Sequence, residues 1–148
     1  MLHPDIQWRE QYASAALNRK FAGIIPTGVY RGFTVTENGD NTVTVDTLNG
    51  VAVCESNGYS LTVRGDGTPE TLTVPDGGWK IVIRGSYAIG GPTTAVLMVV
   101  ADDQPGDALV ASARTENNVT QVAQEPQISL GGGTGGTGGY LDFGEIVD

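Results

Sequence analysis

The 148-residue sequence has few of the residue types on which much enzyme chemistry depends. It contains one cysteine, Cys54, and one histidine, His3. One cysteine excludes an intrachain disulfide, and one histidine excludes a metal site with several histidine ligands. A Ser-His or Cys-His catalytic pair would need His3, which lies beside the first residue, where chains are often frayed. The sequence therefore predicts no enzyme activity, no small-molecule substrate and no cofactor.

Positive charge and long hydrophobic runs are also scarce. Lysine and arginine number 8 against 17 aspartates and glutamates, so the net charge is −9. Binding to nucleic acid needs clustered positive charge, and we expect no nucleic acid partner. No apolar run approaches the ~20 residues of a membrane-spanning helix, and no signal-peptide pattern is present at the first residues. We therefore expect neither a membrane span nor a leader peptide.

Glycine, by contrast, is abundant, at 22 residues, and it separates short segments that alternate between apolar and polar side chains. This pattern, with turn residues every 8–12 positions or so, predicts an antiparallel β-sandwich or barrel over residues 27–130. The sequence does not determine the strand order. The expected strands are Val29–Thr36, Thr42–Thr47, Val51–Cys54, Tyr59–Arg64, Thr71–Val74, Trp79–Arg84, Thr94–Ala101 and Ala108–Thr115.

Two segments depart from this alternation. Thr94–Ala101 is apolar on both faces, so we expect a strand that is either central in the core or buried by a second subunit. Asn117–Pro126 is polar and fits either an edge strand or a loop.

The first 26 residues form a different kind of segment. Asp5–Phe21 contains neither glycine nor proline, and its apolar side chains recur at helical spacing, which predicts one amphipathic helix before the β domain. A lone helix is unstable in water and must pack on the domain or on another chain. The candidate contact residues of this arm and the first strand are Trp8, Tyr12, Leu17, Arg19, Lys20, Phe21, Ile24, Ile25 and Tyr30.

Residues 131–148 form the third expected region. Gly131–Gly139 has too little side chain to pack and predicts a flexible tether. The nine residues that follow are either a frayed acidic tail or a docking peptide. In the docking interpretation the apolar contacts are Tyr140, Leu141, Phe143 and Ile146.

Other candidate sites carry weaker signals. Asp102, Asp103 and Asp107 could gather around Ca²⁺, although a solvated acidic turn is the simpler interpretation and we expect no metal. Trp79, Tyr59 or Tyr87 could form a sugar-binding face, but a core position is favoured for Trp79. Cys54 is expected to be a small buried apolar residue. The tripeptide Arg64–Asp66 is typical of a turn between strands.

One stretch, LNRKFAGIIPTGVYRGFT at Leu17–Thr34, resembles the opening of small structural proteins and fibre N-terminal regions of tailed bacteriophages. The resemblance covers an N-R-K-F element, a G-I-I-P step and a G-V-Y-R-G-F strand. It implies a non-enzymatic component of the virion tail, near the baseplate, collar or fibre attachment point and often a trimer. Such a protein is made in the host bacterial cytoplasm and binds copies of itself and other tail proteins.

Two alternative functions share the same fold class. One is a β-sandwich module that binds glycans on the host surface. The other is a capsid decoration protein, which would bind heads and not tails.

Overall fold

The computed structural model describes residues 2–4 and 25–129, and these residues contain β-strands and no helix. All strand pairings are antiparallel, which confirms the prediction of an all-β antiparallel fold. The helix expected at Asp5–Phe21, the tether and the C-terminal peptide lie outside the described residues. The strands are β1 (Leu2–Pro4), β2 (Gly28–Arg31), β3 (Thr34–Glu37), β4 (Thr42–Asp46), β5 (Val51–Ser56), β6 (Tyr59–Gly65), β7 (Glu70–Thr73), β8 (Gly77–Ser86), β9 (Thr94–Val100), β10 (Ala108–Glu116) and β11 (Val119–Gln124).

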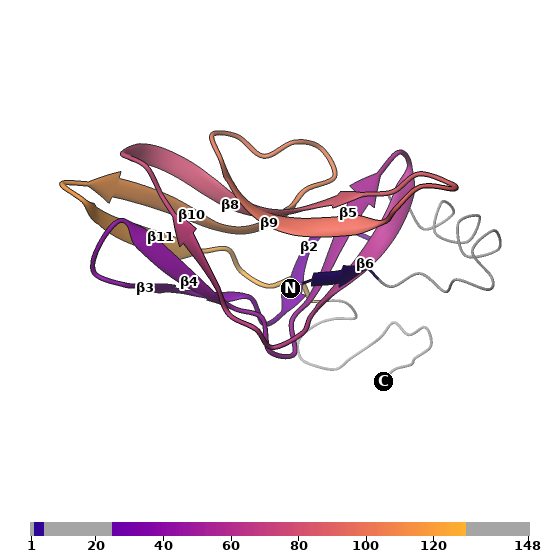
Figure 1. The fold of residues 1–148 in the computed structure, drawn as a ribbon, viewed down its shortest axis with the longest axis horizontal. Coiled ribbons are helices and arrows are strands. Elements are labelled where there is room, and N and C mark those ends of the chain that lie inside the picture. Colours follow the sequence, from indigo (N-terminus) through magenta and orange to yellow (C-terminus); the bar gives the residue numbers. More distant parts are fainter. Residues whose placement is uncertain (1, 5–24, 130–148) are drawn as a thin grey trace.

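The strands form three sheets arranged in two layers. Sheet I has the order β1-β6-β5-β2, sheet II the order β11-β10-β8-β9, and sheet III the order β3-β4-β7. Figure 1 shows sheet II as one long layer, with sheet III beneath one half and sheet I beneath the other. A single hydrophobic cluster joins all three sheets and includes the fully buried side chains of Val43, Val45, Ile81 and Ile83. In the part of the chain that the structure describes, no helix is long and apolar enough to span a membrane.

One expected strand is divided in two. Val29–Thr36 was predicted as a single strand, but β2 belongs to sheet I and β3 to sheet III. The break occurs at Gly32 and Phe33, whose φ angles are 71° and 55°. This left-handed backbone conformation ends an extended strand. The Phe33 side chain is fully buried, and its ring packs so close to Gly50 that a Cβ there would lie 2.7 Å from it. Phe33 therefore fixes the point at which the chain passes between the two sheets.

The connection between β9 and β10 crosses a strand. These two strands flank β8 in sheet II, so residues 101–107 must pass over β8 to join them. Figure 1 shows this connection as an arch over β8 and β9. Val82 points to the side opposite Ile81 and Ile83, because side chains alternate along a strand, and it is nevertheless fully buried.

Two strands lay outside the main predictions. Leu2–Pro4, around the single histidine, forms β1 and pairs with Val63–Gly65 of β6. The polar segment after Thr115 contains β11, so the edge-strand alternative for that segment is confirmed. The apolar strand β9 lies at the other edge of sheet II and not at its centre. Of the two alternatives for that strand, a central position in the core is therefore excluded.

Candidate functional site

The surface expected to mediate assembly falls mostly outside the described residues. Of its members only Ile25 and Tyr30 are described, and both are half-buried. Tyr30 is the extra residue where the register between β2 and β5 shifts, which is a β-bulge. A bulge turns a side chain out of the regular alternation. The Tyr30 hydroxyl donates a hydrogen bond to the Pro26 carbonyl at 2.6 Å, and burial raises the pKa of Tyr30 to about 12.

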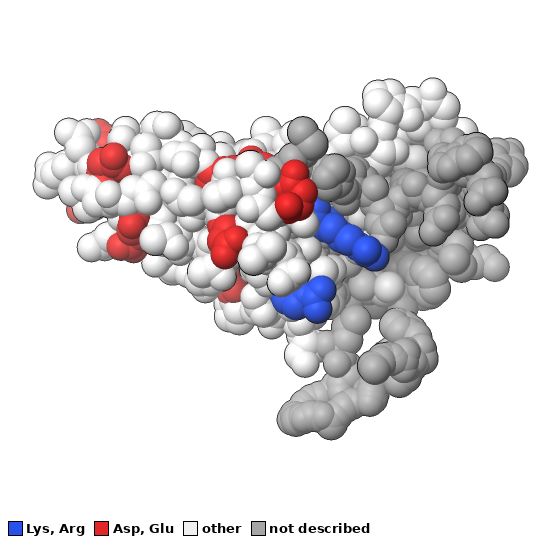
Figure 2. Space-filling model, turned by 60° about the horizontal axis from the view of Figure 1, so that its bottom comes forward, with Lys and Arg blue, Asp and Glu red and all other residues white. Residues whose placement is uncertain are grey.

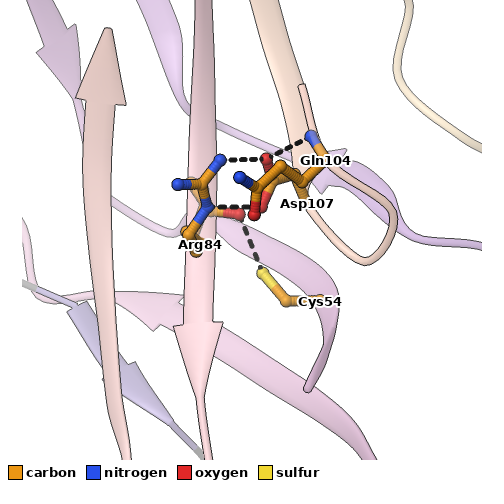
Figure 3. A network of polar contacts seen from close by, with 5 residues as sticks. Cys54, Arg84, Gln104 and Asp107 are labelled. Carbon is orange, nitrogen blue, oxygen red and sulfur yellow. Dashed lines mark hydrogen bonds and ion pairs between the residues drawn. The ribbon is translucent and has the colours of Figure 1, made fainter. Parts of the chain in front are cut away.

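The candidate calcium loop is occupied by an ion pair. Asp107 is buried, and its two carboxylate oxygens accept hydrogen bonds from Arg84 Nε at 2.9 Å and Arg84 Nη2 at 2.8 Å. The backbone N–H of Gln104 donates to the same carboxylate at 2.8 Å, as Figure 3 shows. Asp102 and Asp103 are exposed. Across residues 2–4 and 25–129, no group of three or more metal-ligating side chains comes together.

The protonation of Asp107 follows from these contacts. Burial alone would raise the pKa of this carboxyl group, but the hydrogen bonds from Arg84 and Gln104 outweigh it, so the pKa is lowered. A bidentate guanidinium pair with this geometry is among the stronger charged contacts in proteins. Asp107 therefore anchors the end of the connection that crosses β8, and its oxygens are already engaged by donors.

Cys54 lies close to this ion pair and is chemically inert. The side chain is fully buried, and the thiol donates a hydrogen bond to the Ile83 carbonyl at 3.2 Å (Figure 3). Burial raises the pKa of Cys54 to about 12. Because the thiolate is the nucleophilic form, this cysteine is not a catalytic candidate. The prediction of a small buried residue is confirmed.

The aromatic residues considered for a sugar-binding face are mainly buried. Tyr59 and Tyr87 pack edge to face, with ring centroids 4.8 Å apart, and both are buried. Trp79 is half-buried against the core, and its indole N–H donates to the Asp76 carbonyl at 3.1 Å.

The tripeptide Arg64–Asp66 lies at the end of a strand. The exposed Arg64 and the half-buried Gly65 end β6, and Asp66 follows in the connection to β7, as expected for a turn between strands.

A shallow groove of about 350 Å³, which no motif in the sequence indicates, lies over β8, β10 and β11. Arg114 and Gln121 are directly opposite each other across the β10–β11 pair, so they share one face of the sheet. A sequence pattern does not identify such a groove, because its walls come from three strands. Its main side chains are those of Trp79, Lys80, Ser112, Arg114 and Gln121.

Charge is distributed unevenly over the described surface. Figure 2 shows acidic side chains spread across one face, with cationic side chains gathered at one place on it. On this face the described cationic side chains do not form the continuous track that nucleic acid binding requires.

Comparison with known proteins gives one finding. The chain is 31% identical over 98 residues to the Major tail fiber protein S of Escherichia phage P1, and the match covers 62% of this chain and 40% of that protein. The chain thus corresponds to less than half the length of that relative. No family model matches the chain, and no solved structure matches it significantly. The resemblance to tail proteins of tailed bacteriophages, first found at Leu17–Thr34, is therefore confirmed by similarity to a tail fibre protein.

Proposed function

We propose that the chain is a non-enzymatic structural component of a phage virion tail, at the baseplate, collar or fibre attachment point. The similarity to a phage tail fibre protein carries this proposal. Cys54, the one cysteine of the chain, is buried and its pKa is raised, so its thiol would serve packing in such a component.

In this proposal, the N-terminal arm and the C-terminal peptide hold copies of the chain together, with a trimer favoured, and attach it to other tail proteins. Apolar side chains such as Phe21 and Phe143 would act as anchors in neighbouring chains. Deleting residues 131–148 should leave the β domain folded while lowering the mass of the assembly in light scattering. Loss of folding in that variant would contradict a tether and make the peptide part of the core.

The virion location is tested by fractionating phage particles that carry the chain. We expect the chain to be recovered with tails, where it would be detected by mass spectrometry. Recovery with heads would contradict the tail proposal and support a capsid decoration protein.

A second candidate function, glycan binding, is favoured by the groove on sheet II. Ser112 and Gln121 line this groove, and their hydroxyl and amide groups can donate and accept hydrogen bonds there. Calorimetry with a panel of bacterial surface glycans should then give a signal that Gln121→Ala removes. Gln127→Ala, which changes an exposed glutamine outside the groove, should leave the signal intact.

A further inference from the structure

The edges of the three sheets are protected in different ways, and one edge is an exception. A strand at a sheet edge presents unpaired N–H and C=O groups that can pair with another chain. Natural proteins shield such edges with short strands, prolines, charged residues or covering segments. The sheet edges of this molecule can be compared one by one.

Four of the six sheet edges lie outside sheet II, and all four carry such protection. β1 has three residues and ends in Pro4, and β2 is covered by the chain after β11, where the Ile128 N–H donates to the Val29 carbonyl. β3 and β7 have four residues each and carry Glu37 and Glu70. These edges are short, charged or covered.

Within sheet II, β11 is capped along its outer side. The Thr120 N–H donates to the Asp40 carbonyl at 3.0 Å, and the Val122 N–H donates to Glu37 Oε2 at 2.7 Å. Gln124 then bridges to sheet III, because its side-chain amide donates to the Phe33 carbonyl and accepts from the Val35 N–H. The outward N–H groups at Thr120 and Val122 are therefore already bonded.

Among its own residues and the described segments bonded to it, β9 has none of these devices. It is seven residues long, TAVLMVV, and contains no charge, proline or glycine. Among the described residues, no hydrogen bond connects its outer side to another segment, although β1 lies nearby. Val96 is 48% exposed, and Met98 and Val100 on the same face are only half-buried. A long, apolar and uncapped edge strand is expected to pair with another strand.

We propose that β9 pairs edge to edge with β9 of a second copy of this chain, antiparallel about Leu97, so that two copies of sheet II become one continuous sheet. In this register Val96 lies opposite Met98 of the second copy, and Ala95 lies opposite its Val99. Each exposed apolar side chain then gains an apolar neighbour across the strand pair, which is the unit of sheet stabilisation.

The charges on β8 are compatible with this pairing. In each copy Lys80 is the β8 neighbour of Val100, and Arg84 is the neighbour of Val96. Across the new strand pair, the row that contains Lys80 continues to Thr94 and Ser86 of the second copy. The row that contains Arg84 continues to Met98 and Val82 of that copy. No row places two cations together, so no like charges lie opposite each other across the new strand pair.

The chain contains a matched pair of valines with which to test this proposal. Val96 on β9 and Val119 on β11 are exposed by 48% and 47%, and they lie on opposite edges of the same sheet. Lysine at an edge is a common natural block to strand pairing. The masses of the full-length wild type, Val96→Lys and Val119→Lys are measured by sedimentation velocity over a range of concentrations.

At high concentration we expect Val96→Lys to have half the mass of the wild type, and Val119→Lys to have the wild-type mass. Where the N-terminal arm also joins copies, the mass of Val96→Lys still falls, to that of the assembly that the arm alone holds together, so the test is independent of the proposed function. An unchanged mass in Val96→Lys, or an equal loss in Val119→Lys, would overturn the proposal.

A second measurement needs no variant and covers the case in which Val96→Lys fails to fold. Hydrogen exchange of the wild type should slow at β9 amides as the protein concentration rises, while exchange at β11 stays constant. Exchange at β9 that does not depend on concentration would overturn the proposal.

Discussion

The two edges of sheet II differ more than their sequences suggest. β9 and β11 are both uncharged, and each exposes a valine to a similar extent, at 48% and 47%. Yet β11 is bonded to Asp40, to Glu37 and, through Gln124, to sheet III, whereas β9 has no such contacts among the described residues. The comparison shows that an edge is protected by what the fold brings beside it, and not only by its own residues.

The largest expected effect comes from the ion pair that anchors the connection leaving β9. Asp107→Ala leaves Arg84 without its partner, and breaking this partly buried, doubly hydrogen-bonded pair costs about 2 kcal/mol of unfolding free energy. The matched change beside β11 is Glu116→Ala, which breaks an ion pair with Arg114 whose side chains are 63% and 69% exposed. Exposed pairs contribute less than about 1 kcal/mol.

Denaturant unfolding of both variants checks this prediction. Equal losses in the two variants would show that the anchor beside β9 is no stronger than a surface pair.

A smaller effect is expected when the cap on β11 is removed. Gln124→Ala deletes the bonds to the Phe33 and Val110 carbonyls and to the Val35 N–H, and we expect a loss of about 1 kcal/mol because the side chain is partly solvated. Hydrogen exchange should quicken at Val35 and remain unchanged at β9. Gln127→Ala, which removes one bond to the Gly32 carbonyl, is the control and should have little effect.

The smallest expected effect is the pH dependence of the stabilisation that the Asp107–Arg84 ion pair provides beside β9. The pKa of Asp107 is lowered in the folded protein, so its stabilisation is complete above the unfolded pKa of about 4 and is lost as the pH falls through the lower, folded value. The difference in unfolding free energy between wild type and Asp107→Asn should therefore shrink below about pH 4. A difference that stays constant down to pH 2 would contradict the assigned pKa direction.

Much of the fold follows from local patterns in the sequence. Val43 and Val45 flank Thr44 and are buried, and the apolar Ile81 and Ile83 on β8 are buried as well. The break at Phe33 was missed because a left-handed φ at a bulky residue depends on the distant Gly50, which leaves space for the ring. Local patterning does not reveal such an approach between remote segments.

The candidate site was harder to predict for a similar reason. Asp107 lies in a loop whose three aspartates could hold calcium. Its carboxylate instead accepts hydrogen bonds from Arg84, which lies 23 residues earlier in the chain. Gln124 reaches Phe33 over 91 residues. The unpaired edge of β9 could be predicted only in part. Apolar residues on both faces of a strand indicate that both faces are buried, but only the order of strands shows that one edge of β9 has no neighbouring strand in sheet II.

The order of strands in sheet I has a mechanical consequence. Residues 2–4 form one edge of that sheet, and the chain near Ile128 lies along the opposite edge, beside β2. A tension applied between these two places would load the hydrogen-bond ladders of β1, β6, β5 and β2 in series. The β1–β6 and β2–β5 ladders span three residue pairs each, against six between β5 and β6. Under such a pull one of the two outer ladders would open before the central β5–β6 pair.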